Sequence, residues 1–468
     1  MLFSSNVFLL AFLPIVITLN FFIKTKYSNY LLLVSSLLFY AWGEPVYVLL
    51  MIFSVAMNWI FGLLINRSVT RTKKLLLVLC IILNLLLLGY FKYYNFFANS
   101  FNSFLGTQFI PLKNIALPIG ISFFTFQALS YVIDLYRGNC KVQKSFLNLT
   151  LYVSFFPQLI AGPIVRYSDI DEQISNRSVT VEKFSFGFRR FLYGLGKKII
   201  ISNIMAEMAD KIFSLPTEQL TTVTAWLGAI CYTMQIYYDF SGYSDMAIGL
   251  GKIFGFDFLE NFNYPYLSCS IREFWQRWHI SLGTWFREYV YIPLGGNRKG
   301  NVRTYFNLIA VFFLTGMWHG ASWTFIIWGL YHGFFQILER LKLKNFLSKH
   351  RIISRIYCLI VVVFGWVLFR SETLKGGLSY ITHMIMPWHY NLSEMFAFSV
   401  DINVRPILII FIAIIGCGLI QKLSCKFTKL SNKWKYSKLE FVYLGFVFIY
   451  CLILLSAGTY NPFIYFRF

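Results

Sequence analysis

Residues 304–338 have the sequence TYFNLIAVFFLTGMWHGASWTFIIWGLYHGFFQIL, in which two apolar arms flank a turn rich in glycine, tryptophan and histidine. Arg303 precedes the first arm and Arg340 follows the second. Because basic loops stay on the cytoplasmic side, the chain is predicted to enter the membrane here and to return on the same side. The first arm, residues 305–318, would extend only about 21 Å as a helix, short of a hydrocarbon core of about 30 Å. His319, which follows this arm, is therefore predicted to lie within the membrane.

The composition of the whole chain indicates a membrane protein built from helices. Hydrophobic residues make up 57% of the sequence and charged residues 13%, about half the usual share of charge in a soluble domain. With apolar runs close to the length of a span, this predicts an all-α polytopic membrane protein with about eleven transmembrane or re-entrant helices. We expect one domain over residues 1–468, with spans in 1–90, the core that carries the chemistry in 91–340, and further spans in 341–468.

The distribution of charge sets the expected orientation. The net charge is +22, but the basic residues lie in short loops between apolar runs, a pattern typical of cytoplasmic loops and not of a nucleic-acid-binding face. Lys24 and Lys26 follow the first apolar run, which has no small-residue cleavage site after it. That run is therefore expected to be retained in the cell membrane with the N-terminus outside. Residues 371–404, with Lys375 as their one basic residue, are expected outside, and residues 421–440, with six lysines, inside.

Two acidic residues, Asp239 and Asp245, follow an apolar run over residues 220–238. A charge at membrane depth costs a few kcal/mol. We therefore expect either structural pairing with an arginine of residues 272–303 or capping of a helix end. The basic residues of 189–198 predict an amphipathic segment along the cytoplasmic interface.

Three of the six histidines, His279, His319 and His332, lie beside tryptophan, tyrosine or glycine. Ionisable groups at membrane depth are costly and therefore often functional, and imidazole suits the removal of a proton from a hydroxyl group near neutral pH. His319 is the predicted general base. His279 follows a basic, aromatic segment on the expected cytoplasmic side, and both a direct and a structural role stay open for it. His332 is expected to pack between helices.

Metal and thiol chemistry have weaker support in the sequence. There is no His-Glu-x-x-His motif and no cysteine or histidine pair at ligand spacing, so no metal site is expected. Nothing beside Cys269 marks it as an activated nucleophile. Arg272 and Arg277 could bind phosphate groups at the cytoplasmic mouth, although basic residues there also serve as topology signals.

The motifs together resemble the membrane-bound O-acyltransferase family. The resemblance is closest to its bacterial polysaccharide branch, typified by the membrane subunit of alginate O-acetyltransferases, and it covers most of residues 90–340. The residues that carry it are LPIGISF at 117–123, FPQLIAGP at 156–163, YDFSGYSD at 238–245, and the segments 272–298, 316–322 and 328–333.

The resemblance implies a ring of helices around a thinned centre crossed by a tunnel. An acyl thioester, expected to be acetyl-CoA, would enter from the cytosol, and a polysaccharide hydroxyl would be met on the far side, directly or through an extracytoplasmic partner protein. The family's histidines correspond to His319 as the base and His279 as the assisting residue. No tightly bound cofactor is expected, and membrane lipids would surround the chain. The further candidates for substrate contact are Trp318, Trp278, Arg272, Arg277 and Asn297.

Several alternatives stay open at this point. One is transfer of D-alanine from a carrier protein to teichoic acid, which a neighbouring branch of the family performs. Another is a polysaccharide transporter without chemistry, for which paired discontinuous helices in two related halves would be the sign; the sequence has no such symmetry. A third is a lipid acyltransferase. Among candidates for stabilising an oxyanion, the sequence offers Trp318 and Asn297 without deciding between them.

Overall fold

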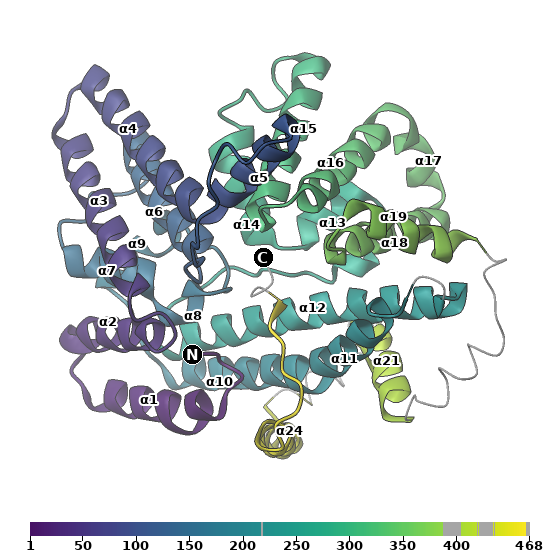
Figure 1. Ribbon diagram of the computed structural model, residues 1–468. Helices are drawn as coiled ribbons and strands as arrows, with labels where there is room; N and C mark the ends of the chain where they lie inside the picture. The colour runs from purple at the N-terminus through teal and green to yellow at the C-terminus, as the bar shows by residue number, and fades with distance from the viewer. Residues whose placement is uncertain (217–218, 387–403, 419, 421–433, 435, 465–468) are drawn as a thin grey trace. The chain divides into compact units, whose positions relative to one another are not determined.

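The computed structural model describes residues 1–216, 219–386, 404–418, 420, 434 and 436–464, and these residues form helices and no strand. The prediction of an all-α protein is therefore confirmed for this part of the chain. The chain divides into two compact units, Met1–Phe191 with Ser244–Glu260, and Leu192–Tyr243 with Asn261–Phe468. Figure 1 shows the course of the helices.

The first unit contains most of the long apolar helices of the N-terminal half. Its elements are η1 (Phe8–Phe12), α1 (Leu13–Phe22), α2 (Thr25–Ala41), α3 (Tyr47–Arg67), α4 (Thr70–Leu88), η2 (Gly89–Tyr93), α5 (Tyr94–Leu105), α6 (Ile121–Arg137), α7 (Phe146–Ser154), α8 (Phe156–Leu159), α9 (Tyr167–Ser175) and most of α10 (Val181–Gly196). Helices α3, α4 and α6 pack against one another, and α2 packs on α7 (Figure 1).

The second unit contains the region that the sequence analysis singled out. Its elements are η3 (Lys197–Ser202), α11 (Asn203–Phe213), most of α12 (Thr222–Ile253), η5 (Pro265–Leu267), α13 (Ile271–Arg277), α14 (Ile280–Phe286), η6 (Arg287–Tyr291), α15 (Gly300–His319), α16 (Trp323–Leu338), η7 (Glu339–Leu343), α17 (Lys344–Lys349), α18 (Arg351–Arg370), α19 (Leu374–Ile385), α21 (Val404–Gly416) and α24 (Lys438–Ser456). Helix α16 packs against α15, α13 and α18.

Four helical stretches among the described residues are long and apolar enough to cross a membrane. They are Tyr47–Arg67, Thr70–Leu105, Arg351–Arg370 and Lys438–Ser456, with shorter apolar helices at Phe8–Phe22 and Arg405–Gly416. The count of about eleven spans stays a prediction. Of the segments expected outside at 371–404 and inside at 421–440, residues 387–403, 421–433 and 435 lie outside the described residues.

The stretch Thr70–Leu105 differs from its predicted form. The sequence predicts the N-terminal spans within residues 1–90. Instead the helix continues through the π-helical turn η2 into α5, over 36 residues in all. The aromatic and amide residues of α5 continue a helix without difficulty, and the chain turns only at Gly106, which has a left-handed φ of 66°.

The acidic residues of α12 are paired, but with different partners from those predicted. Helix α12 runs unbroken for 32 residues, so Asp239 and Asp245 lie inside it and do not cap it. Asp239 pairs with Lys198 at 2.6 Å and Asp245 with Arg190 at 2.6 Å, so the prediction of an arginine from residues 272–303 is wrong. Lys198 is 1% exposed, which also contradicts its predicted place on an interfacial surface.

The Lys198–Asp239 pair holds the C-terminal segment of the second unit. Lys198 donates a hydrogen bond to the carbonyl of Pro462, and Asp239 accepts one from the backbone N–H of Ile464 at 2.8 Å. A buried ion pair requires such additional hydrogen bonds to offset the loss of hydration of both charges. The segment after α24 is therefore part of the packed interior of this unit.

Candidate active site

The hairpin of α15 and α16 is the framework of the candidate site. A Cβ added to Gly329 would lie 2.2 Å from the carbonyl oxygen of Phe312, and one added to Gly316 would lie 2.4 Å from that of Phe325. Glycine at these two positions allows the helix backbones to approach closely, as small residues do between membrane helices. The two predicted apolar arms are thus the two helices of one tightly packed hairpin.

Helix α15 is longer than the arm predicted from the sequence. It begins at Gly300 and has 20 residues, or about 30 Å at 1.5 Å per residue. Its polar first turn is fixed by the hydroxyl of Thr304, which bonds to the carbonyl of Gly300 at 2.8 Å, and by Arg303, which bonds to the carbonyl of Leu294 at 3.1 Å. A helix of this length matches a hydrocarbon core of about 30 Å. The length of α15 therefore gives no support to a helix that stops short of a full span, and the depth of His319 in the membrane stays a prediction.

His319 is the last residue of α15 and is 7% exposed. Three aromatic rings lie around its imidazole in edge-on geometry. The ring centroids of Trp318, Trp328 and Phe369 are 5.0, 5.1 and 5.2 Å away. Trp328 comes from α16 and Phe369 from α18, so tertiary packing of three helices forms this pocket of rings.

His279 lies at the N-terminal cap of α14 in a left-handed conformation with φ of 44°, which is uncommon for a residue with a Cβ. It is 1% exposed and packs edge-on against Phe240 of α12, with the ring centroids 4.5 Å apart. The imidazole lies in the interior, against Phe240 of α12 and Trp318 of α15.

Asn261 determines the tautomer of His279. Its Oδ1 accepts from the backbone N–H of Ser281 at 3.2 Å and from the Ser281 hydroxyl at 2.9 Å. Since a backbone N–H can only donate, this atom is the acceptor oxygen of the amide. The Nδ1 of His279, 3.2 Å from the same oxygen, must then carry the proton. The lone pair is on Nε2, which is the arrangement that a general base needs.

The surroundings of His279 also favour its neutral form. Burial lowers the pKa of His279 well below its usual range near 6.5, and the nearby His319 lowers it further. Helices α13 and α14, on either side of it, are not among the candidate spans. A neutral imidazole at pH 7 can accept a proton, whereas a charged one cannot.

Trp318 lies between the two histidines. Its ring centroid is 5.0 Å from that of His319 and 5.9 Å from that of His279, and it is 4% exposed. The sequence predicts the two histidines in separate places, His279 on the cytoplasmic side and His319 at a deep turn. That separation is wrong, because the chain after α12 folds inward and brings His279 against the indole that neighbours His319.

The other predicted contact residues have different environments. Trp278 is buried in an aromatic cluster, stacked on Phe274 at 5.6 Å. Arg277 pairs with Glu273 at 2.9 Å and bonds to a backbone carbonyl. Arg272 and Asn297 are exposed, Asn297 in the turn before α15. Of the five candidates, Trp318 is the one that the structure places against both imidazoles.

Other side chains at the site were not singled out from the sequence. Asn261 lies in an irregular loop, Phe369 is an ordinary helix aromatic by its sequence context, and Phe240 belongs to the YDFSGYSD motif, which gave it no role of its own. Asn307, which is fully buried, bonds to the carbonyl of Gly296 at 2.9 Å and so fixes the turn that precedes α15. His332 is fully buried beside Trp275, with ring centroids 5.0 Å apart, as expected of a histidine that packs between helices.

Comparison with known proteins gives the chain its family. The model of the membrane-bound O-acyltransferase family, MBOAT, matches residues 139–381. The chain is 41% identical over 488 aligned residues to the probable alginate O-acetylase AlgI of Pseudomonas putida, with 100% of both chains covered. It is 37% identical to a peptidoglycan O-acetyltransferase of Helicobacter pylori, over 82% of this chain and 80% of that one.

A more distant relative is the teichoic acid D-alanyltransferase of Bacillus subtilis, 34% identical over 47% of this chain and 58% of its own length. The family match includes His279, His319 and the helices that carry them. The chain therefore belongs to the membrane-bound O-acyltransferase family and is an O-acyltransferase.

Proposed function

We propose that the chain lies in the plasma membrane and transfers acetyl groups from acetyl-CoA, a cytosolic thioester, to hydroxyl groups of an extracytoplasmic polysaccharide. The transfer is direct or passes through an extracytoplasmic partner protein. The observation that carries this proposal is the pair of buried imidazoles on either side of Trp318. The relatives that match over most of their length are named for acetyl transfer to alginate or peptidoglycan.

In the proposed mechanism His319 takes the proton from the attacking hydroxyl, and the hydroxyl oxygen forms a bond to the thioester carbonyl carbon. The carbon–sulfur bond then breaks, the thiolate leaves, and it takes up the proton. General-base assistance of this kind is worth about 10²–10⁴ in rate. His279, neutral and held by Asn261, orients the thioester or relays the proton, and the surrounding rings exclude water from the reacting atoms.

The second candidate reaction is D-alanyl transfer to teichoic acid. It is supported by the match to the Bacillus subtilis enzyme, although that match covers only 47% of this chain. The two reactions differ in their donor, because D-alanine would arrive on a carrier protein. Membranes that contain the chain should therefore be given acetyl-CoA labelled in its acetyl group, or a D-alanyl carrier protein labelled in its alanine.

The variant His319→Ala tests the proposed base. We expect it to lose polymer acetylation by about 10²-fold or more while it still inserts into the membrane. His350→Ala is the matched control, since His350 is exposed at the cap of α18. Persisting acetylation in His319→Ala would contradict the mechanism, and label from the carrier protein alone would favour the second reaction.

A further inference from the structure

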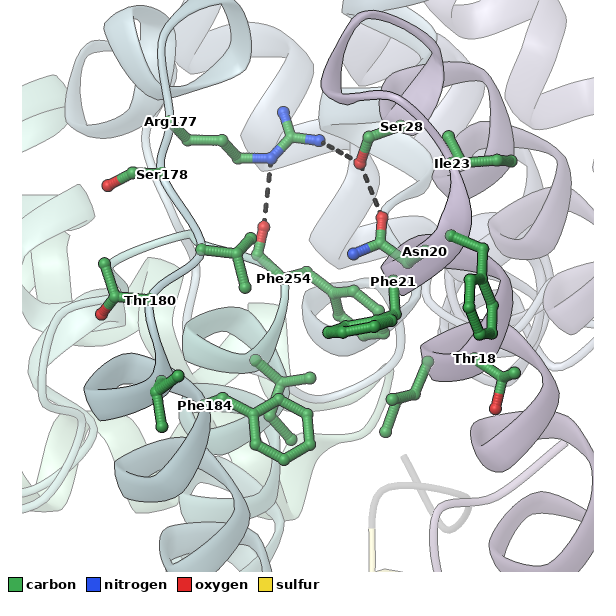
Figure 2. A pocket seen from close by; sticks show the side chains of 15 residues that line it. Thr18, Asn20, Phe21, Ile23, Ser28, Arg177, Ser178, Thr180, Phe184 and Phe254 are labelled. Carbon is green, nitrogen blue, oxygen red and sulfur yellow. Dashed lines mark hydrogen bonds between the residues drawn. The ribbon is translucent and has the colours of Figure 1, made fainter.

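The first unit contains a cavity of about 800 Å³ between the end of α1, the start of α2 and the loop that joins α9 to α10 (Figure 2). Its walls are mostly apolar, and one end is polar. The polar end is formed by Arg177, Ser28 and Asn20. The loop-charge pattern puts this end of α1, which precedes Lys24 and Lys26, at the cytoplasmic surface of the membrane.

Arg177 is the charged group of this cavity. It reaches from its loop to the opposite wall, where its Nη2 donates to the hydroxyl of Ser28 at 3.0 Å and its Nε donates to the carbonyl of Phe254 at 3.1 Å (Figure 2). Its Nη1 donates to the Oδ1 of Asn29 at 2.5 Å and to the carbonyl of Ile174. The hydroxyl of Ser28 in turn donates to Asn20 at 2.7 Å.

Every one of these acceptors is neutral. Within the described residues no carboxylate lies within ion-pair distance of Arg177, whereas two other partly buried arginines of this unit have carboxylate partners: Arg166 pairs with Asp169, and Arg190 with Asp245 and Glu260. Burial lowers the pKa of Arg177 to about 10, which leaves the guanidinium charged at pH 7. A guanidinium has five N–H donors, and four of them are used here, so one N–H of Nη2 remains for an anion.

The mouth of the cavity is apolar and exposed. Phe21 and Phe22 at the end of α1 are 82% and 79% exposed, and Val181 at the start of α10 is 81% exposed. Such residues at the end of an apolar helix lie where acyl chains meet headgroups. The cavity thus combines an apolar opening with a cation that has no counter-ion among the described residues. This combination matches a ligand that is anionic at one end and apolar at the other.

We propose that this cavity binds an anionic membrane phospholipid, with its phosphodiester on Arg177 and an acyl chain over Phe21 and Phe22. Arginine pairs with phosphate through charge-assisted hydrogen bonds that are shorter and stronger than neutral ones. The site is separate from the chemistry of the histidines, so its test does not depend on the acyl-transfer reaction. A purely structural role for Arg177, tying two walls together, is the outcome that the test must distinguish.

Asn20→Asp is the decisive variant. It is isosteric and keeps an acceptor for the Ser28 hydroxyl, but it places a carboxylate in the polar end of the cavity, where it competes with a phosphate for Arg177. Asn345→Asp is the charge-matched control, because Asn345 is an exposed residue of α17. Arg177→Gln is the second variant, which removes the cation itself.

The full chain in detergent should be titrated with dioleoylphosphatidylglycerol or dioleoylphosphatidylcholine, and bound lipid counted by native mass spectrometry. We expect the wild type and Asn345→Asp to prefer phosphatidylglycerol, and Asn20→Asp and Arg177→Gln to bind it about tenfold or more weakly. Equal binding by all four chains would overturn the proposal. A second outcome would also overturn it: Asn20→Asp abolishes the binding of inorganic phosphate or acetyl-CoA and leaves lipid binding unchanged. The ligand of the cavity would then be a soluble anion.

Discussion

Asn261 fixes His279 through a single oxygen atom that accepts from Ser281 twice and from the imidazole once. We expect Asn261→Ala to lower acyl transfer by roughly 10²-fold, because the proton is then free to move to Nε2; loss of tautomer control in a catalytic triad costs even more. Asn263→Ala, at an exposed position of the same loop, is the control and should keep full activity. Equal activity of the two variants would remove His279 from the mechanism.

Asn261→Asp gives a pH test of the same contact. A carboxylate beside the imidazole favours its protonated form, so it raises the pKa of His279, which burial otherwise lowers. In the proposed mechanism the neutral form of His279 is the active one, so activity should begin to fall at a higher pH on the acid side than in the wild type. The measurement is the pH profile of initial rates. An unchanged acid limb would mean that His279 does not titrate in the reaction.

At the scale of the element, the α15–α16 hairpin depends on Gly329. A methyl group there would meet the carbonyl oxygen of Phe312, so Gly329→Ala must push the helices apart and displace Trp328 from His319. We expect about 1–3 kcal/mol of destabilisation, as for other overpacked sites, together with loss of activity. Gly445→Ala in α24 is the control, because a Cβ there meets nothing within 4 Å. Similar melting temperatures for both variants would contradict the close approach.

The ion pair between η3 and α12 makes a second prediction at this scale. Lys198→Met leaves Asp239 charged and buried, which should cost about 3–5 kcal/mol. The double variant Lys198→Met with Asp239→Leu should cost less than the sum of the single changes. Lys211→Met is the control, because Lys211 and Glu207 form an exposed pair, worth about 1 kcal/mol or less. The measurement is the melting temperature of four variants: Lys198→Met, Asp239→Leu, the double variant and Lys211→Met. Equal losses for Lys198→Met and Lys211→Met would show that the buried pair is unimportant.

At the scale of the whole molecule, the orientation in the membrane is open to a direct test. Helix α3 is a candidate span of 21 residues, with exposed valines at Val46 and Val69 on either side. The loop charges predict Val46 outside and Val69 inside. In a cysteine-free background, an impermeant maleimide added to intact cells should label Val46→Cys and not Val69→Cys. The reverse pattern would invert the predicted topology.

The class of the protein and its helical content could be predicted from the sequence, which also marked His279 and His319 as candidates for the chemistry, because hydrophobic run length and the family motifs are local properties of the chain. It could not determine that Trp318 lies between the two histidines, that Asn261 holds one of them, or that Lys198 and Arg190 neutralise Asp239 and Asp245. These contacts join residues far apart in sequence, and a buried charge or imidazole takes as partner whatever group the packing brings within hydrogen-bond distance. The tertiary structure decided them because desolvation makes each buried polar group costly until such a partner is found.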